Sequence, residues 1–168
     1  YDQLFTKNPG TQERTIWHQD LPFWPVRGNH IASLWLALTP VGRNTSGVEY
    51  VAGSHRWGKY YNPLLTASST TLHRDDLEPC PDFSLLRDDP KYRFLSWDME
   101  PGDILVHHPL SVHGSGGNQS ATVRRIGLST RWLGDDARWE PKEKTMYVEG
   151  DPQLNDGDKP AGEPFPLC

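Results

Sequence analysis

The sequence predicts an all-β fold with long loops, of the jelly-roll or barrel type, in a single domain. Short runs of β-favouring residues follow one another between turn signals, which is the pattern of antiparallel β architectures. Glycine and proline occur fifteen times each in the 168 residues, a frequency that favours a turn-rich β protein over a helical bundle. A chain of this length is also long enough to bury a hydrophobic core.

Eight strands are expected, each a short run rich in β-branched, aromatic or alternating residues. In chain order they are Gln3–Lys7, Arg14–Gln19, Ile31–Leu38, Val48–Val51, Arg93–Trp97, Asp103–His107, Leu110–His113 and Val123–Trp132. Turn-forming residues separate these runs, at Asn8-Pro-Gly10, Arg27-Gly-Asn29, Asn44-Thr-Ser-Gly47, Ala52-Gly-Ser54, Pro101-Gly102 and Gly114-Ser-Gly-Gly-Asn118. Strands of this length and turns at this density favour a jelly roll or barrel.

Two segments lie outside the predicted strands. The stretch from Tyr60 to Lys91 lacks periodicity, and we expect it to form a lid over an active site. The alternative is a long loop that packs on the surface of the barrel away from such a site. Beyond Gly134 the sequence is polar and rich in proline and glycine, so residues 1–134 are expected to form the core and residues 135–168 an extended tail. The chain begins at Tyr1, inside an expected strand, which suggests that an N-terminal region is missing.

Charge and cysteine content limit the possible partners. The formal net charge is −5, and no run of Lys or Arg is longer than Arg124-Arg125, which argues against nucleic acid or an anionic membrane as the main partner. No segment approaches the ~18 apolar residues of a membrane span, and no signal peptide is visible. The two cysteines, Cys80 and Cys168, are too few for a disulfide framework, so a reducing cytoplasm is expected.

Candidate metal ligands occur in two of the expected strands. His18 and Asp20 are two residues apart at a strand end, so both side chains would leave the same face. His113 precedes a glycine-rich turn and completes a 2-His-1-carboxylate set, the ligand type of non-haem iron(II) oxygenases. Taken singly, each histidine would more simply be a surface or turn residue. The aspartate spacing, the turn context and the downstream Arg124 together favour the metal site.

Longer motifs identify a known family that the chain resembles. They are Trp17-His-Gln-Asp20 with Phe23-Trp24, Gly47-Val-Glu-Tyr-Val-Ala-Gly-Ser-His55, Glu100-Pro-Gly-Asp103, His113-Gly-Ser-Gly-Gly-Asn118 and Val123-Arg-Arg125. Their order and spacing over residues 2–134 resemble the phytanoyl-CoA dioxygenase family of Fe(II)- and 2-oxoglutarate-dependent oxygenases. The resemblance implies a double-stranded β-helix, cupin-like, with His18, Asp20 and His113 as iron ligands. It also implies 2-oxoglutarate and O2 as cosubstrates.

The same resemblance implies a binding site for the distal carboxylate of 2-oxoglutarate. Arg124 would pair with this carboxylate, because a planar guanidinium binds a carboxylate through two parallel hydrogen bonds, and Ser115 would donate a further bond. On a strand Arg124 shares a face with Ile126 and Leu128, whereas Arg125 lies on the other face. We therefore expect Arg124 to point inward and Arg125 to be solvated.

Other residues receive weaker expectations. Phe23, Trp24 and Trp35 are candidates for lining a substrate pocket, although core packing is the default role of buried aromatic residues. Lys7 is expected on the surface rather than beside 2-oxoglutarate. One imidazole of the His107-His108 pair could face the cavity, but neither belongs to the expected triad.

The function these features predict is that of a dioxygenase that hydroxylates a small organic substrate and releases succinate and CO2. The carboxylate ligand favours hydroxylation, because a halogenase of this broad class would carry a small residue at position 20. Two alternatives stay open: a cupin-type metalloenzyme that does not use 2-oxoglutarate, and a jelly-roll binding protein without turnover. Succinate production separates the first alternative from the prediction, and the complete triad argues against the second.

Overall fold

The computed structural model describes residues 2–62, 74–142, 145–146, 148, 153–162 and 164–167. These residues form β-strands joined by loops and by short 3₁₀ helices, which confirms the predicted all-β class. The 3₁₀ helices are η1 (Leu21–Phe23), η2 (Ser54–Arg56) and η4 (Phe83–Leu86). Within this part of the chain no helix is long and apolar enough to cross a membrane.

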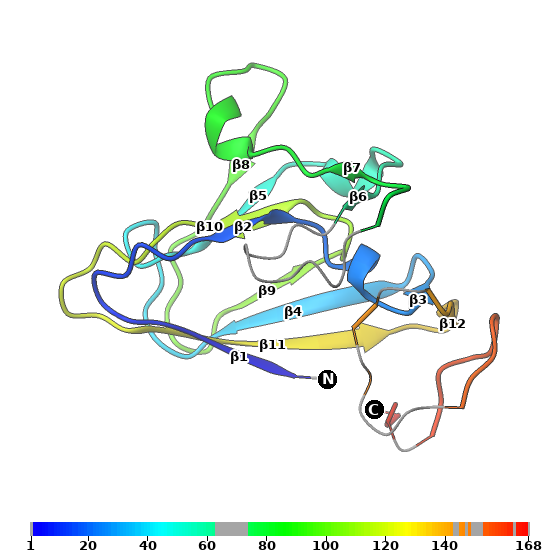
Figure 1. Ribbon diagram of the computed structural model, residues 1–168. Coiled ribbons are helices and arrows are strands. Elements are labelled where there is room, and N and C mark those ends of the chain that lie inside the picture. Colours follow the sequence, from blue (N-terminus) through cyan, green and yellow to red (C-terminus); the bar gives the residue numbers. More distant parts are fainter. Residues whose placement is uncertain are drawn as a thin grey trace.

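Two four-stranded antiparallel sheets lie one over the other (Figure 1). The long sheet has the order β1 (Gln3–Lys7), β11 (Arg125–Leu133), β4 (Ile31–Ala37) and β9 (Ile104–His107). The short sheet has the order β2 (Thr15–His18), β10 (His113–Ser115), β5 (Val48–Val51) and β8 (Phe94–Leu95). Neighbouring strands within a sheet are distant in sequence, as in a jelly roll, and this confirms the predicted architecture.

Two short strand pairs extend this frame. β3 (Val26–Arg27) pairs with β12 (Arg138–Trp139), and β6 (Tyr61–Asn62) pairs in parallel with β7 (Glu78–Pro79). The expected strand at Leu110–His113 is displaced, because the backbone N–H of Ser111 donates to the carbonyl of His108 at 2.8 Å and closes a turn there. Strand β10 begins only at His113, which places this residue at the strand start beside β2.

Side-chain alternation in the long sheet separates an inner face from an outer one. On β4 the buried residues are Ile31, Ser33, Trp35 and Ala37, and on β11 they include Arg125, Gly127 and Ser129. The outer face carries apolar side chains that stay partly or largely exposed. Leu4 is 60% exposed, Ile104 52% and Val106 65%. The inner face of this sheet is therefore more polar than its outer face, an inversion that decides where the arginines point.

The segment after Gly134 differs from the expected tail. Ala137 and Trp139 are buried in a core cluster with Leu21, Phe23 and Trp24. The backbone N–H of Met146 also donates to the carbonyl of Phe23 at 2.7 Å. Where it is described, this segment packs against the β core instead of extending without a core of its own, because Trp139 supplies an apolar surface that 3₁₀ helix η1 covers.

The described part of the expected lid packs away from the candidate metal site. Tyr61, Cys80 and Phe83 form a buried cluster with Trp17. Trp17 precedes His18 on β2, so the two side chains leave opposite faces of the short sheet. No described residue between 60 and 91 lines the cavity at His18. For these residues the lid prediction is wrong, and residues 63–73 lie outside the described part of the chain.

Candidate active site

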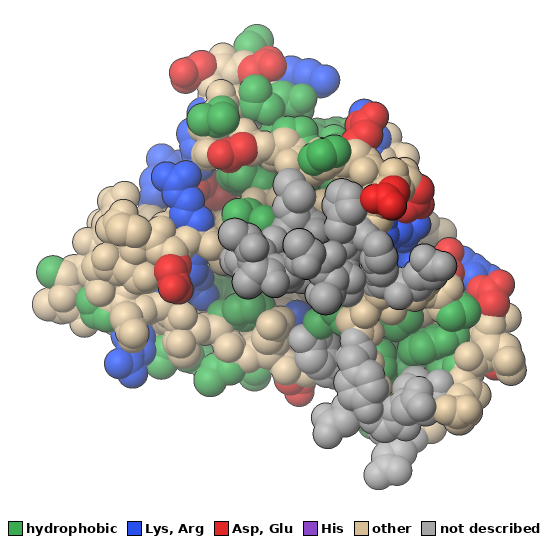
Figure 2. Space-filling model, in the orientation of Figure 1, with side chains coloured by type: hydrophobic (Ala, Val, Ile, Leu, Met, Phe, Trp, Pro, Cys, Tyr) green, Lys and Arg blue, Asp and Glu red, His purple; other side chains and the backbone are tan. Residues whose placement is uncertain are grey.

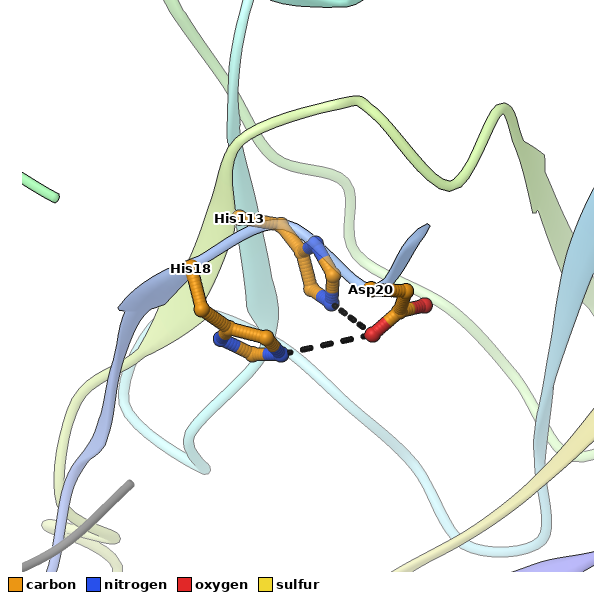
Figure 3. Close-up of side chains that lie close together, drawn as sticks. All are labelled: His18, Asp20 and His113. Carbon is orange, nitrogen blue, oxygen red and sulfur yellow. Dashed lines mark ion pairs between the residues drawn. The ribbon is translucent and has the colours of Figure 1, made fainter. Parts of the chain in front are cut away.

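Neighbouring strands of the short sheet bring the three predicted metal ligands together (Figure 3). His18 on β2 is the register partner of His113 on β10, so the two imidazoles leave the same face side by side. Asp20 follows β2 at the start of η1, where its backbone N–H donates to the carbonyl of Pro109 at 2.8 Å. One ligand atom from each residue lies within 4.8 Å of the others.

The orientation of both imidazoles is set by backbone carbonyls. Nδ1 of His18 lies 2.7 Å from the carbonyl oxygen of Ile16, and Nδ1 of His113 lies 2.9 Å from that of Ser111. A carbonyl oxygen can only accept, so each Nδ1 carries a proton, and in the neutral imidazole Nε2 is the nitrogen with the lone pair. The Nε2 atoms lie 3.4 and 3.8 Å from Oδ1 of Asp20. Two nitrogen donors and one oxygen donor thus converge, as a metal requires.

Burial and mutual charge shift the pKa values in this cluster. Burial lowers the pKa of His113 to about 3, and the neighbouring His18 adds to this effect, so His113 is neutral. Burial acts against the charged form of His18 too, but the bond to Asp20 outweighs it and raises the pKa of His18. Burial likewise opposes the charged form of Asp20, yet the imidazoles of His113, His107 and His18 hold its pKa well below the usual range. The carboxylate is therefore ionised and ready to bind a cation.

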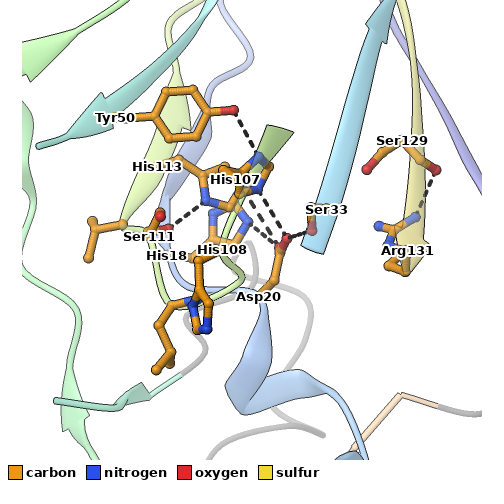
Figure 4. A network of polar contacts seen from close by, with 12 residues as sticks. His18, Asp20, Ser33, Tyr50, His107, His108, Ser111, His113, Ser129 and Arg131 are labelled. Atoms are coloured by element: carbon orange, nitrogen blue, oxygen red, sulfur yellow. Dashed lines mark hydrogen bonds and ion pairs between the residues drawn. The ribbon is translucent and has the colours of Figure 1, made fainter. Parts of the chain in front are cut away.

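The long sheet supports this carboxylate from the opposite side (Figure 4). Ser33 on β4 donates from Oγ to Oδ2 of Asp20 at 2.8 Å. His107 on β9 places Nε2 3.6 Å from the same oxygen, and the hydroxyl of Tyr50 lies 3.1 Å from Nδ1 of His107. Burial, and secondarily the charge of Asp20, raises the pKa of Tyr50, so this hydroxyl stays protonated.

A cavity of about 420 Å³ opens beside the cluster between the two sheets. The three ligand candidates line it, together with aromatic and apolar side chains that include the predicted Phe23, Trp24 and Trp35. These aromatic residues are also nearly fully buried, so they serve both core packing and the cavity wall. A volume of this size suits a small organic molecule.

The predicted arginine lies on the wrong strand face. Arg124 is exposed, whereas Arg125 is 2% exposed and lines the cavity. The prediction assumed that the apolar partners Ile126 and Leu128 mark the inner face, but they lie on the partly exposed outer face of the long sheet. The correction follows from this inversion of polarity: His, Asp, Ser and Arg side chains line the cavity, so an apolar strand face does not identify the inward direction.

A glycine two residues after Arg125 is the signal that could have identified the inner face. A Cβ at Gly127 would collide with the indole ring of Trp35. Glycine within a strand marks the close approach of another group. The same indole lies beneath the guanidinium of Arg125, with 5.5 Å between the guanidinium carbon and the ring centroid. Arg125, Gly127 and Trp35 therefore share the crowded face.

Two cations stand directly opposite each other at this end of the cavity. Lys7 on β1 is the register partner of Arg125, and like charges in this relation are destabilising without an anion between them. Burial, together with the charge of Arg125 and against that of Glu13, lowers the pKa of Lys7 to about 8. Burial also lowers the pKa of Arg125 to about 10. Lys7 is 9% exposed, so the expectation of a surface lysine is wrong.

Ser115 lies next to this cation pair, where it was predicted to act. Its Oγ accepts from Nζ of Lys7 at 3.1 Å and from Oγ of Ser46 at 3.3 Å. Ser46 has a left-handed backbone, with φ 65°, and also lies 3.4 Å from Nη2 of Arg125. Nε of Arg125 has no hydrogen-bond partner, and no carboxylate within the described ranges pairs with this guanidinium. The residues missed from the sequence here are Lys7, Ser46 and Arg125.

A jelly roll that carries this His-x-Asp and distal His set, with a buried arginine in the same cavity and a buried lysine beside it, has the architecture of the iron(II)- and 2-oxoglutarate-dependent oxygenases. The model of the phytanoyl-CoA dioxygenase (PhyH) family matches residues 1–126. The chain belongs to this family.

Individual relatives agree with this assignment. The peroxisomal phytanoyl-CoA dioxygenase of Rattus norvegicus is 26% identical over 163 residues, which cover 92% of this chain and 43% of the relative. A probable alpha-ketoglutarate-dependent hypophosphite dioxygenase of Stutzerimonas stutzeri is 26% identical over 121 residues, 72% of this chain and 40% of the relative. The chain thus spans less than half the length of these two curated relatives.

Solved structures share the fold. The non-heme alpha ketoglutarate dependent carbocyclase SnoK from nogalamycin biosynthesis superposes with a TM-score of 0.71 at 23% identity, covering 98% of this chain and 59% of that one. The epimerase SnoN, in complex with Fe3+, alpha ketoglutarate and nogalamycin RO, superposes with a TM-score of 0.68 at 22% identity, covering 98% and 62%.

Proposed function

We propose that this chain is the core of an Fe(II)- and 2-oxoglutarate-dependent dioxygenase that hydroxylates a small organic substrate and releases succinate and CO2. One observation carries the proposal: a single cavity holds three converging metal donors and a buried guanidinium without a carboxylate partner among the described residues. A binding protein would not need the complete donor set, and a metalloenzyme without a dicarboxylate would leave Arg125 unpaired.

The donor set fits iron(II). His18, Asp20 and His113 would hold the ion through two Nε2 atoms and one carboxylate oxygen, which is the facial triad of non-haem iron oxygenases. When bound, iron would supply the redox chemistry with O2 and 2-oxoglutarate, for which no side chain of the cluster is suited. The chain's own residues orient the ligands: the carbonyls of Ile16 and Ser111 keep both imidazoles in one tautomer.

The cation pair fits the distal carboxylate of 2-oxoglutarate. Arg125 would bind it through a charge-assisted pair of hydrogen bonds, and Ser115 would donate a further one. Lys7, held behind Ser115 by the carbonyls of Glu13 and Gly116 at 2.9 Å each, adds positive charge at the same end. A buried charge is costly without a counter-charge, so a carboxylate ligand would relieve both cations at once.

The remaining wall of the cavity would receive the substrate. Phe23, Trp24 and Trp35 present aromatic surface near the metal donors, and Ile16 and Val48 add aliphatic surface. Such a wall favours a substrate with an apolar part placed beside the metal, and it excludes bulk water from the reacting atoms. The neighbour SnoN carries nogalamycin RO, whereas the Stutzerimonas relative is named for hypophosphite, so family membership by itself does not select the substrate.

Succinate formation is the direct test of this proposal. With Fe(II), O2 and 2-oxoglutarate, the chain is expected to convert 2-oxoglutarate to succinate, slowly alone and faster with a correct substrate. Removal of Fe(II) with a chelator should stop the conversion, and added Fe(II) should restore it. Metal binding without succinate would favour a cupin-type enzyme that does not use 2-oxoglutarate. Binding of small molecules with neither metal nor succinate would favour the non-catalytic jelly roll.

The affinity for 2-oxoglutarate is expected to fall as the pH rises from 7 to 9. The pKa of Lys7 is about 8, so this ammonium is mostly charged at pH 7 and mostly neutral at pH 9. Deprotonation of Lys7 removes positive charge beside Arg125 and therefore weakens binding of the dianionic 2-oxoglutarate. The effect should reach up to about tenfold, because the protonated fraction of Lys7 falls by about that factor between pH 7 and pH 9. The dissociation constant can be measured with the Co(II)-loaded chain at both pH values. In the Lys7→Met variant binding should be weaker at pH 7 and its dependence on pH flatter; an unchanged slope would contradict the role of Lys7.

We also propose the reducing, cytoplasmic location expected from the sequence, because two cysteines are too few for a disulfide framework. Cys80 is a buried free thiol, and burial raises its pKa to about 12, which makes it unreactive. A small molecule is the proposed partner of the cavity.

A further inference from the structure

His107 is a buried imidazole in the cavity that the proposed metal triad does not use. Its side chain is 9% exposed and lines the cavity. Nε2 has no hydrogen-bond partner, although a buried polar atom without a partner is costly and rare. The nearest acidic group is Asp20, whose Oδ2 lies 3.6 Å from this nitrogen, within ion-pair distance but beyond hydrogen-bond length.

The neighbours of His107 determine which nitrogen carries its proton. The hydroxyl of Tyr50 lies 3.1 Å from Nδ1 and can either donate or accept. An unprotonated Nε2 would direct its lone pair at the ionised carboxylate of Asp20, which is repulsive. The favourable arrangement is therefore that Tyr50 donates to Nδ1 and that Nε2 carries the proton, directed at Oδ2 of Asp20 (Figure 4).

In the long sheet His107 lies beside Ser33, a second residue whose side chain is directed at Oδ2 of Asp20. His107 on β9 is the register partner of Ser33 on β4. Ser33 already donates to Oδ2 of Asp20 at 2.8 Å. Oδ1 faces the other way, 3.4 Å from Nε2 of His18 and 3.8 Å from Nε2 of His113. The two oxygens of one carboxylate are thus divided between the two sheets.

We propose that His107 is a positioning residue which, together with Ser33, holds Oδ2 of Asp20 so that Oδ1 is presented to the metal, with Tyr50 fixing the tautomer of His107. This inference rests on the proposed metal centre. A carboxylate held at one oxygen would bind a metal through the other oxygen, so Asp20 would take one coordination position and leave the remaining ones to 2-oxoglutarate and O2. His107 does not complete the donor set itself, because the atoms that converge are those of His18, Asp20 and His113.

Cobalt(II) affinity tests this role without any requirement for turnover. The dissociation constant and the visible absorption spectrum of bound Co(II) are measured for the unmodified chain and for His107→Phe, His107→Gln and Tyr50→Phe. His107→Phe keeps a planar ring and is expected to bind Co(II) about 10–100-fold more weakly, the usual effect of losing a partner of a metal ligand. His107→Gln keeps an N–H donor at similar reach and should recover most of the affinity. Tyr50→Phe should change affinity in the same direction by a smaller factor.

A matched control and the choice of readout separate the outcomes. His55→Phe replaces a histidine outside the cavity and should bind Co(II) like the unmodified chain. Unchanged affinity and spectrum in His107→Phe would overturn the inference, and so would His107→Gln binding as weakly as His107→Phe, because a donor would then not be what matters. If Asp20→Ala loses Co(II) while His107→Phe does not, only this inference fails. If Asp20→Ala keeps Co(II), the proposed metal centre fails.

Discussion

Asp20→Ala is expected to abolish iron binding and the conversion of 2-oxoglutarate to succinate together. Asp20 supplies the only anionic donor of the triad, and its oxygens are held by groups from both sheets. Loss of an outer partner of a metal ligand typically costs 10–100-fold in affinity, so loss of the ligand itself should cost more than about a hundredfold. Metal content after gel filtration and succinate yield at saturating Fe(II) measure the two effects.

The control for this variant is Asp88→Ala, which removes an exposed aspartate that does not line the cavity. It should retain both metal and turnover. Undiminished succinate formation by Asp20→Ala would contradict the proposal that His18, Asp20 and His113 hold the iron, whatever the metal content. A variant that keeps iron but forms no succinate would also contradict it, because binding and turnover are expected to be lost together.

Arg125→Ala should raise the apparent Michaelis constant for 2-oxoglutarate by more than about a hundredfold. Removing one partner of a buried charge pair typically costs on the order of 3–5 kcal/mol, because the other charge is left without its partner. Arg125 is a buried cation in the cavity lining whose Nε has no hydrogen-bond partner, and the neighbouring ammonium of Lys7 cannot reproduce the planar fork that binds a carboxylate. Steady-state kinetics at saturating Fe(II), with the 2-oxoglutarate concentration varied, give the constant directly.

The adjacent residue is a matched control. Arg124→Ala removes the same charge from an exposed position and should change the constant by no more than about twofold, since exposed charges contribute little. Arg125→Lys should recover only part of the affinity, because an ammonium cannot reproduce the planar fork. Equal effects at positions 124 and 125 would mean that neither arginine binds the distal carboxylate.

The three candidate metal ligands could be singled out from the sequence because the relation between two of them is local. His18 and Asp20 are separated by one residue at a strand end, and the alternation of a strand puts both on one side. His113 lies in a distinctive glycine-rich context that the family motif identifies. Most of the expected strands also match, for the same reason: β1 and β5 were predicted with the bounds that the structure has, because turn residues close them on the chain itself.

The cationic end of the cavity could not be predicted in the same way. Lys7 and Arg125 are cross-strand neighbours only because β1 pairs with β11, and their two positions are far apart in the chain. Face assignment on β11 failed because apolar residues were taken to mark the interior, whereas in this sheet the interior is a polar cavity.

Local residue patterns were thus sufficient for the all-β class, for most of the strands and for selecting the candidate donors, since each of these inferences depends on neighbours in the chain. Three other features depend on which strands lie side by side. They are the pairing of Lys7 with Arg125, the approach of Trp35 to Gly127, and the contacts of the two carboxylate oxygens of Asp20 with different sheets. Strand pairing is decided by the burial of whole sheets against each other, and a single strand carries too little of that information to reveal its partner.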